Sequence, residues 1–323
     1  MNVHDLVDEL YEVFADRIGE PLADSARDLP RALSLAPVSV PWSRVFSHEV
    51  TLGAPALFAE AMPQVGPPLL RNAVMAHLLA VVDAFGTDRI EDEQIDASPN
   101  VFAVLGQARR ERDRAIVRMF GGVVPPDCDF RAADALTMRA IRGERAMLLS
   151  GRAVDMGIYE HASLDKQCAG IIASVALARA AGWDSRRCSA VRATLESVSL
   201  GLQLSDDVVD WEDDMQRGGA WAVCLMRGTP RPGFPSLSLR PERPESIRTQ
   251  VLRSGVLGLM LSRACRHMKW ARRRASAMGA HRLASWAAGQ EARLSSLATA
   301  EEASAGYAVR ASALAAWASE VLA

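Results

Sequence analysis

The chain has 323 residues, of which 49% are hydrophobic, so it can bury a large core within one large domain or two small ones. Its formal net charge of -2 shows no basic excess, which argues against a general attraction to nucleic acid or to an anionic membrane. The five cysteines are widely spaced and form no CxxC pair, so the sequence predicts neither a disulfide framework nor a zinc site.

The N-terminal segment 1–14 carries acidic charges and alternates apolar with polar positions. A signal peptide would instead begin with basic residues and continue with an uninterrupted apolar stretch. No run approaches the roughly 18 to 20 apolar residues that a membrane-spanning helix requires. We therefore expect a cytoplasmic protein without stable membrane insertion.

Helical periodicity dominates the remaining sequence, and convincing alternation of the β-strand type is absent. Apolar residues recur at three- and four-residue spacing over the ranges 72–85, 131–156, 168–182, 190–211 and 247–278. Clusters of proline and glycine predict breaks at 34–41, 64–68 and 121–127. With helices of average length, this pattern predicts one all-α domain over 1–323, built from roughly eight to ten helices.

Two segments lie at the margins of this helical pattern. We expect residues 1–45 to form an N-terminal helical extension, and residues 227–246 to form a loop rich in proline and arginine. A loop of that length inside a compact domain is typical of a lid or a mobile segment. It follows directly after the most acidic part of the chain.

The first acidic segment, DAFGTDRIEDEQID, places Asp88, Asp92 and Asp96 four residues apart. On a helix this spacing puts the carboxylates in a column on one face, with neighbours about 5 to 6 Å apart. Like charges at that distance repel each other, and a divalent cation relieves the repulsion. Mg²⁺ fits best, because it prefers hard oxygen ligands and often uses one or two carboxylates together with substrate phosphates.

The second acidic segment, LGLQLSDDVVDWEDDMQRGG, places Asp206 or Asp207, Asp210 and Asp214 on one helical stripe by the same spacing, with Gln203 one turn earlier. Apolar residues flank and interrupt these acids, so we expect a largely buried helix whose carboxylates line a cavity. Burying unpaired carboxylates is costly, which again favours a bound cation.

Acidic stripes on helices are more commonly solvated faces or partners of arginine side chains, and this chain is rich in arginine. Each segment alone is open to that interpretation, the first one especially, because EDEQID could simply be a helix end facing water. Two such stripes in one apolar, helical chain favour a metal site over two unrelated solvated faces.

These residues resemble the trans-isoprenoid synthase superfamily, and within it the squalene and phytoene synthases, which carry DxxxD twice. The matches are Asp88-Arg-Ile-Glu-Asp92 and Asp210-Trp-Glu-Asp-Asp214, and the stretch QLSDDVVDWEDDMQRG is similar to the pattern Q-x-x-N-x-x-R-D-x-x-E-D-x-x-x-G without a gap. The resemblance covers roughly residues 70–220. It implies an all-α isoprenoid synthase-type bundle in which two Asp-rich helices face each other across a central apolar cavity.

Departures from the family pattern narrow the implied activity. Gln167, Phe85 and Gly219 stand where squalene and phytoene synthases usually carry tyrosine, arginine and a basic residue. The arginine pair that chain-elongating synthases carry after their first motif is missing from DASPNVF. The resemblance therefore implies that one allylic prenyl diphosphate is ionised and that the prenyl cation passes to another acceptor. Some squalene synthase-like enzymes use aromatic acceptors in this way, carbazoles among them.

The resemblance implies two or three Mg²⁺ ions bound with the diphosphate. The expected metal ligands are Asp88, Asp92, Asp206, Asp207, Asp210 and Asp214. Four of them, Asp88, Asp92, Asp210 and Asp214, are also the expected catalytic residues. The expected substrate-binding residues are Arg44, in the short element SRVF, together with Lys166, Arg217, Gln203, Phe85 and Trp211. The expected partners are an allylic prenyl diphosphate and a small-molecule acceptor, with no nucleic acid, and a homodimer is left open.

Three alternatives to this prenyltransferase remain open. A terpene synthase would cyclise or deprotonate the cation without an acceptor, although its NSE-type second motif is replaced here by aspartates. A head-to-head prenyl condensing enzyme would need the groups that the departures above remove. A non-catalytic helical binding protein with the same fold would need none of these carboxylates.

Overall fold

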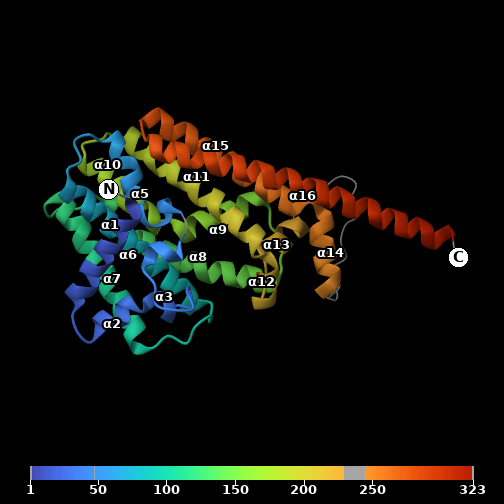
Figure 1. The fold of residues 1–323 in the computed structure, drawn as a ribbon, viewed down its shortest axis with the longest axis horizontal. Coiled ribbons are helices and arrows are strands. Elements are labelled where there is room, and N and C mark those ends of the chain that lie inside the picture. Colours follow the sequence, from blue (N-terminus) through green and yellow to red (C-terminus); the bar gives the residue numbers. More distant parts are fainter. Residues whose placement is uncertain (1, 47, 229–243, 322–323) are drawn as a thin grey trace. The chain divides into compact units, whose positions relative to one another are not determined.

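The computed structural model describes residues 2–46, 48–228 and 244–321, with described side chains over 2–46, 48–228 and 247–306. Every regular element within these ranges is a helix, which confirms the all-α prediction (Figure 1). The α-helices are α1 (Val3–Ile18), α2 (Leu22–Arg27), α3 (Leu29–Ala32), α4 (Trp42–Val45), α5 (Glu49–Phe58), α6 (Pro67–Glu91), α7 (Pro99–Phe120), α8 (Phe130–Ser150), α9 (Met156–Gln167), α10 (Ala169–Ala180), α11 (Ser185–Val209), α12 (Trp211–Arg217), α13 (Trp221–Gly228), α14 (Pro244–Ser254), α15 (Val256–Met278) and α16 (His281–Val321). Two short 3₁₀ helices, η1 (Ala59–Ala61) and η2 (Pro126–Cys128), complete the set.

The three expected breaks are confirmed, but the periodic stretches contain further interruptions. The range 247–278 forms two helices, because Gly255 adopts a left-handed conformation with φ 68° between α14 and α15. The range 131–156 ends early, because Gly151 at φ 57° follows the last residue of α8. The described ranges thus hold more helices than the eight to ten expected, several of them too short to show a period.

The chain divides into two compact units whose segments alternate along the sequence. The first unit comprises Met1–Arg142, Asp165–Glu196 and Arg272–Ser285, and the second comprises Gly143–Leu164, Ser197–Ala271 and Trp286–Ala323. The first acidic segment lies in the first unit and the second acidic segment lies in the second. Each unit is therefore described by itself.

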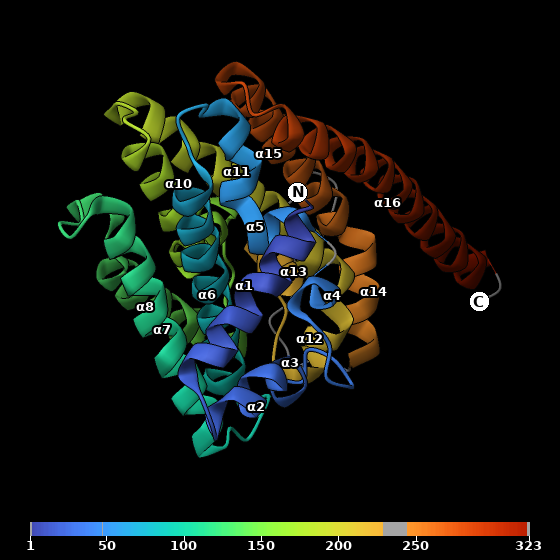
Figure 2. The ribbon, with the colours of Figure 1, turned by 60° about the vertical axis from the view of Figure 1, so that its left-hand side comes forward.

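Helix α6 is the central helix of the first unit and contacts α5, α7 and α10 (Figure 2). It begins after Gly66 with two prolines in its first turn, where their missing N–H groups cost nothing. It is long and apolar enough to cross a membrane, contrary to our expectation that no segment would qualify. However, 67% of its most apolar window is buried inside the protein, as in the core helix of a folded unit.

The N-terminal residues belong to the first unit rather than projecting from it. The apolar face of α1 buries Leu6, Leu10 and Phe14, and this helix contacts α2, α4, α5, α6 and α7. Part of the loop expected at 227–246 is described as α13 and α14, whereas residues 229–243 lie outside the described residues.

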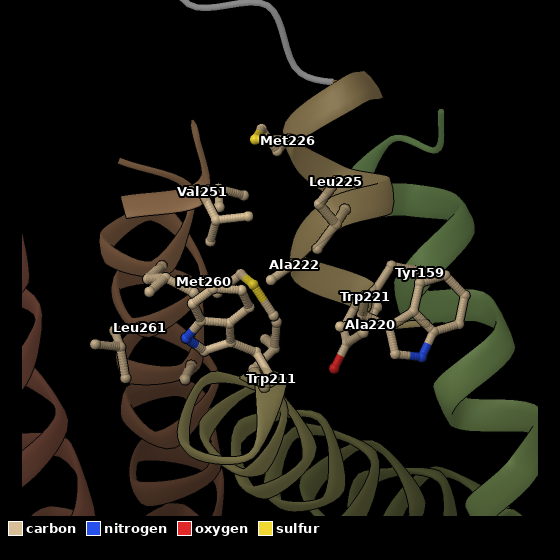
Figure 3. Close-up of a cluster of buried hydrophobic side chains, with 14 of the residues drawn as sticks. Tyr159, Trp211, Ala220, Trp221, Ala222, Leu225, Met226, Val251, Met260 and Leu261 are labelled. Atoms are coloured by element: carbon tan, nitrogen blue, oxygen red, sulfur yellow. The ribbon is translucent and has the colours of Figure 1, made fainter. Parts of the chain in front are cut away.

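The second unit is organised around one apolar cluster formed by α9, α11, α12, α13, α14, α15 and α16. Figure 3 shows part of this cluster, with Trp211 beside Met260 and Leu261, and with Tyr159 beside Trp221. Tyr159 is completely buried, and its ring meets that of Trp221 edge-on at a centroid distance of 5.1 Å. This cluster supports the helix that carries the second acidic segment.

Candidate functional site

The first acidic segment does not form a single helical column. Helix α6 ends at Glu91, and Asp92 is its C-cap residue, whose backbone N–H still donates to the carbonyl oxygen of Asp88. The next residue, Glu93, has a positive φ of 54°, so the chain leaves the helix there. Asp96 consequently lies in the connection to α7, and its predicted place on the helical face is wrong.

Asp88 and Lys166, which we predicted for different roles, lie together in the first unit. The ammonium group of Lys166, near the end of α9, is 3.0 Å from Oδ1 of Asp88. That oxygen makes no hydrogen bond of regular geometry, so the contact is an ion pair alone. Both side chains are about four-fifths buried, at 20% and 22% exposure, which places a cation and an acid side by side in a semi-buried position.

The predicted Arg44 element lies next to the C-terminal part of α6. Phe46 follows α4, and its ring contacts that of Phe85 at a centroid distance of 4.7 Å. Asp8 of α1 fixes the element by accepting hydrogen bonds from the backbone N–H and the hydroxyl of Ser43. Arg44 is exposed, and it forms no ion pair with any carboxylate among the described residues.

The second acidic segment forms the predicted stripe across the junction of two helices. Helix α11 ends at Val209, and Asp210 is the N-cap residue of α12. The backbone N–H of Asp210 donates to the carbonyl of Asp206 at 2.9 Å, and that of Asp214 donates to the carbonyl of Asp210 at 2.9 Å. The four-residue spacing therefore continues through the junction, with Asp206 and Asp210 exposed and Asp214 half-buried.

Asp207, unlike Asp206 and Asp210 of this stripe, is buried. Its Oδ2 accepts a hydrogen bond from the hydroxyl of Tyr159 at 2.5 Å, and its Oδ1 accepts one from the amide of Gln203 at 2.8 Å. Asp207 is only 7% exposed, and this burial raises the pKa of its carboxyl to about 8. Of the two candidates for the first position of the stripe, Asp206 is the one on the exposed face.

Asp214 lies close to several other carboxylates. Burial is the main cause that raises the pKa of Asp214 to about 6; the neighbouring guanidinium of Arg217, 3.4 Å away, opposes the shift. The carboxylates of Asp210, Asp206 and Glu144 raise this pKa further. Sequence reasoning missed Glu144, which lies on α8 and accepts a hydrogen bond from the indole N–H of Trp221 at 2.7 Å. Nothing in its local sequence distinguishes it from other charged residues of α8.

The second acidic helix is less buried than predicted. Val209, one of the apolar residues between the aspartates of this segment, is the last residue of α11 and is 67% exposed. Trp211 is 6% exposed and packs in the apolar cluster of the second unit (Figure 3). The helix junction is therefore anchored on one side and open on the side of the aspartate stripe.

A third group of charged residues, in the first unit, was also missed. Asp83 lies in the apolar stretch of α6 and accepts hydrogen bonds at 2.7 and 2.8 Å from the Nε of Arg109 on α7. Arg109 also donates to the hydroxyl of Thr87 at 3.1 Å. An aspartate inside an apolar run signals a buried partner, although the sequence does not identify which arginine supplies it.

Among the described residues, no three histidine, cysteine, aspartate or glutamate side chains are arranged to hold a metal ion by themselves. The donor set at the second segment nevertheless fits Mg²⁺, which is usually held by one or two carboxylates together with phosphate oxygens. Burial and the nearby carboxylates of Asp210, Asp206 and Glu144 raise the pKa of Asp214, and a bound cation would favour its charged form.

No protein-family model and no curated protein matches this sequence. Solved structures do match. The chain is similar to a polyprenyl synthetase from Streptomyces coelicolor A3(2), with a TM-score of 0.67 and 13% identity, covering 89% of this chain and 97% of that one. It is also similar to a geranylgeranyl pyrophosphate synthetase from the archaeon Geoglobus acetivorans, with a TM-score of 0.57 and 16% identity, covering 90% and 98% of the two chains.

A third similar structure is a decaprenyl diphosphate synthase from Rhodobacter capsulatus, with a TM-score of 0.53 and 13% identity, covering 90% of this chain and 99% of that one. At these identities the likeness establishes the fold, which is the helical isoprenyl synthase type that the sequence predicts. The closer resemblance to squalene and phytoene synthases stays a prediction.

Proposed function

We propose that this protein is a Mg²⁺-dependent prenyltransferase that ionises an allylic prenyl diphosphate and transfers the prenyl group to a small acceptor. The observation that carries the proposal is the open stripe of Asp206, Asp210 and Asp214, whose last member has a pKa raised to about 6 by burial and by neighbouring carboxylates. Such a cluster gains most from a bound cation. The fold, shared with structures named as prenyl diphosphate synthases, supports the same chemistry.

We assign the stripe residues Asp206, Asp210 and Asp214 as metal ligands in the second unit. When bound, Mg²⁺ neutralises the charge that develops on the leaving diphosphate. Arg217 lies beside the stripe and is available to donate to diphosphate oxygens.

In the first unit, Asp88 and Asp92 remain proposed metal ligands, and Lys166 and Arg44 remain proposed diphosphate donors. The ion pair between Lys166 and Asp88 supports this assignment, because it places a donor cation beside a carboxylate before substrate binds. Phe85 is proposed to contact the prenyl chain, since its ring lies on the same part of α6.

The acceptor is proposed to be a small aromatic metabolite, by resemblance to squalene synthase-like enzymes of secondary metabolism. To test this, the protein is incubated with Mg²⁺ and with dimethylallyl, geranyl or farnesyl diphosphate, and diphosphate release is measured with and without aromatic acceptors. We expect release that requires both Mg²⁺ and an acceptor. Quantitative turnover without any acceptor would instead identify a terpene synthase.

The contribution of the stripe is tested with Asp210→Asn, which removes one ligand charge without changing side-chain size. We expect diphosphate release to fall by on the order of 100-fold, as when one charge-stabilising group is removed from an active site. Asp213→Asn is the matched control, because Asp213 lies exposed on the same short helix but off the stripe. Equal losses in the two variants would contradict the assignment.

Chain elongation is a second candidate, and the names of the three similar structures are the observation that favours it. In that reaction the acceptor is isopentenyl diphosphate rather than an aromatic compound. Adding isopentenyl diphosphate to the same assay separates the two candidates. Products lengthened by five-carbon units, with no product from aromatic acceptors, would establish elongation and sink the aromatic proposal.

A further inference from the structure

We infer that Asp207 is a positioning residue rather than a metal ligand, and that Tyr159 and Gln203 hold it so that the stripe carboxylates face outward together. This inference rests on the proposed function, since it concerns how the metal-binding face is aligned. It separates two adjacent aspartates that look equivalent in the sequence.

The hydrogen bonds of Asp207 are the first argument. One carboxylate oxygen accepts from the Tyr159 hydroxyl and the other accepts from the Gln203 amide, at 2.5 and 2.8 Å. A metal bound directly to Asp207 would have to share both oxygens with buried donors, on a side chain that is only 7% exposed. Asp206, one residue earlier, is exposed to solvent.

The burial of the partners is the second argument. Tyr159 is completely buried, and its ring is held edge-on against Trp221, whose indole N–H donates to Glu144. Figure 3 shows Tyr159 and Trp221 side by side in the apolar cluster. Tyr159 therefore reaches Asp207 from a fixed position, contributed by a helix 48 residues away in sequence.

The place of Asp207 on the helix is the third argument. It lies in the last turn of α11, three residues before the junction at Asp210, where regular helical geometry is interrupted. A side chain anchored at this point fixes the rotation of the turn about its axis. Because Asp206 and Asp210 belong to the same turn, that rotation decides whether their carboxylates point to one side.

The experiment compares binding of Mn²⁺ in the presence of inorganic diphosphate, followed by electron paramagnetic resonance, in wild type and variants. Tyr159→Phe removes only the hydroxyl that donates to Asp207, and we expect the apparent Mn²⁺ affinity to fall about 10-fold, as for other residues that orient metal ligands. Tyr11→Phe is the matched control, because Tyr11 is also buried and donates its hydroxyl to a backbone carbonyl, that of Ala26. We expect no change of affinity in that variant.

Substitutions of Asp207 itself separate positioning from ligation. Asn keeps an oxygen that can accept from Tyr159, so Asp207→Asn should retain more Mn²⁺ affinity than Asp207→Ala, and much more than Asp210→Asn. If Asp207→Asn loses as much affinity as Asp210→Asn, Asp207 is a ligand and the inference is wrong. Unchanged affinity in Tyr159→Phe would overturn it as well.

If the wild type binds no Mn²⁺ with diphosphate, the proposed function fails, and hydrogen exchange then decides the inference. A positioning role predicts faster amide exchange over residues 203–214 in Tyr159→Phe and not in Tyr11→Phe. Equal exchange in wild type and Tyr159→Phe would overturn the positioning role, whatever the protein binds.

Discussion

Arg112 is a nearly fully buried cation in the first unit, 1% exposed, and the structure surrounds it with acids. Its guanidinium binds both oxygens of Asp134 at 2.7 and 2.8 Å and lies over the ring of Phe130 at 4.2 Å. Such an arginine–carboxylate pair adds little stability by itself but becomes costly when one partner is removed.

We therefore expect Arg112→Met to lower the free energy of unfolding by about 3 to 5 kcal/mol. Urea denaturation measures this change. The control is Arg110→Met on the same helix, where the side chain is exposed and the expected effect is within about 0.5 kcal/mol. If the two variants are equally stable, the buried pair does not matter to the fold.

His77 is a second buried polar residue of the first unit, 4% exposed, with Nε2 placed 3.0 Å from the carbonyl oxygen of Thr51. Burial is the main cause that lowers the pKa of His77 from 6.5 to about 4. The folded state thus favours neutral imidazole. Its contribution to stability is complete above pH 6.5 and is lost progressively as the pH falls to about 4.

This pKa difference corresponds to about 3 kcal/mol. We predict that stability falls more steeply between pH 6.5 and pH 4 in wild type than in His77→Gln, since glutamine keeps an amide donor and does not titrate. Unfolding free energies across this pH range test the prediction. Parallel curves for the two proteins would mean that His77 is not held neutral by the fold.

At the scale of elements, the end of α13 is closely packed against a loop of the second unit. A Cβ atom added at Gly228 would lie 2.0 Å from the backbone oxygen of Val154 and 2.4 Å from its carbonyl carbon. In the same loop, the backbone N–H of Val154 donates a hydrogen bond of 3.1 Å to the carbonyl oxygen of Cys224 in α13. Backbone atoms cannot move aside as a side-chain end can.

Gly228→Ala should therefore lower the free energy of unfolding by about 3 kcal/mol, which is the upper end of the usual cost of adding a methyl group to a packed site. Gly289→Ala in α16 is the control, because nothing lies within 4 Å of its added Cβ. There the higher helix propensity of alanine should stabilise by about 0.5 to 1 kcal/mol. Thermal unfolding of both variants gives the comparison, and a neutral Gly228→Ala would contradict the packing described.

The sequence patterns predicted where the helices lie more accurately than where they end. The four-residue spacing of Asp88 and Asp92 is kept, but Asp96 falls beyond the end of α6 at Glu91. The chain leaves the helix at the left-handed Glu93, a residue type that carries no strong sequence signal for this conformation. The spacing of Asp206, Asp210 and Asp214 survives a helix junction, which periodicity alone does not detect.

At the scale of the whole molecule, binding of Mg²⁺ should depend on diphosphate. No group of three ligand side chains among the described residues is ready to hold a metal alone. We predict that Mg²⁺ or inorganic diphosphate added separately changes the melting temperature little. When both are added, at about 100 times the dissociation constant of the Mg²⁺–diphosphate complex with the protein, the free energy of unfolding should rise by about 2.7 kcal/mol.

Differential scanning calorimetry with each component alone and with both checks this prediction, and chelation by EDTA should reverse the effect. Full stabilisation by Mg²⁺ alone would indicate a preformed metal site of another kind. Asp210→Asn should lose the joint effect, whereas Asp213→Asn should keep it.

The sequence by itself determined the helical class of this protein, the position of most long helices and the two acidic segments, because periodicity and i, i+4 spacing are properties of neighbouring residues. Tertiary structure decided which aspartate of a pair faces outward. Asp207 turns inward because Tyr159, 48 residues earlier, donates to it. It also decided that Asp88 meets Lys166 and that Asp83 meets Arg109. Those partners are distant in sequence, and only packing of the helices brings their charges together.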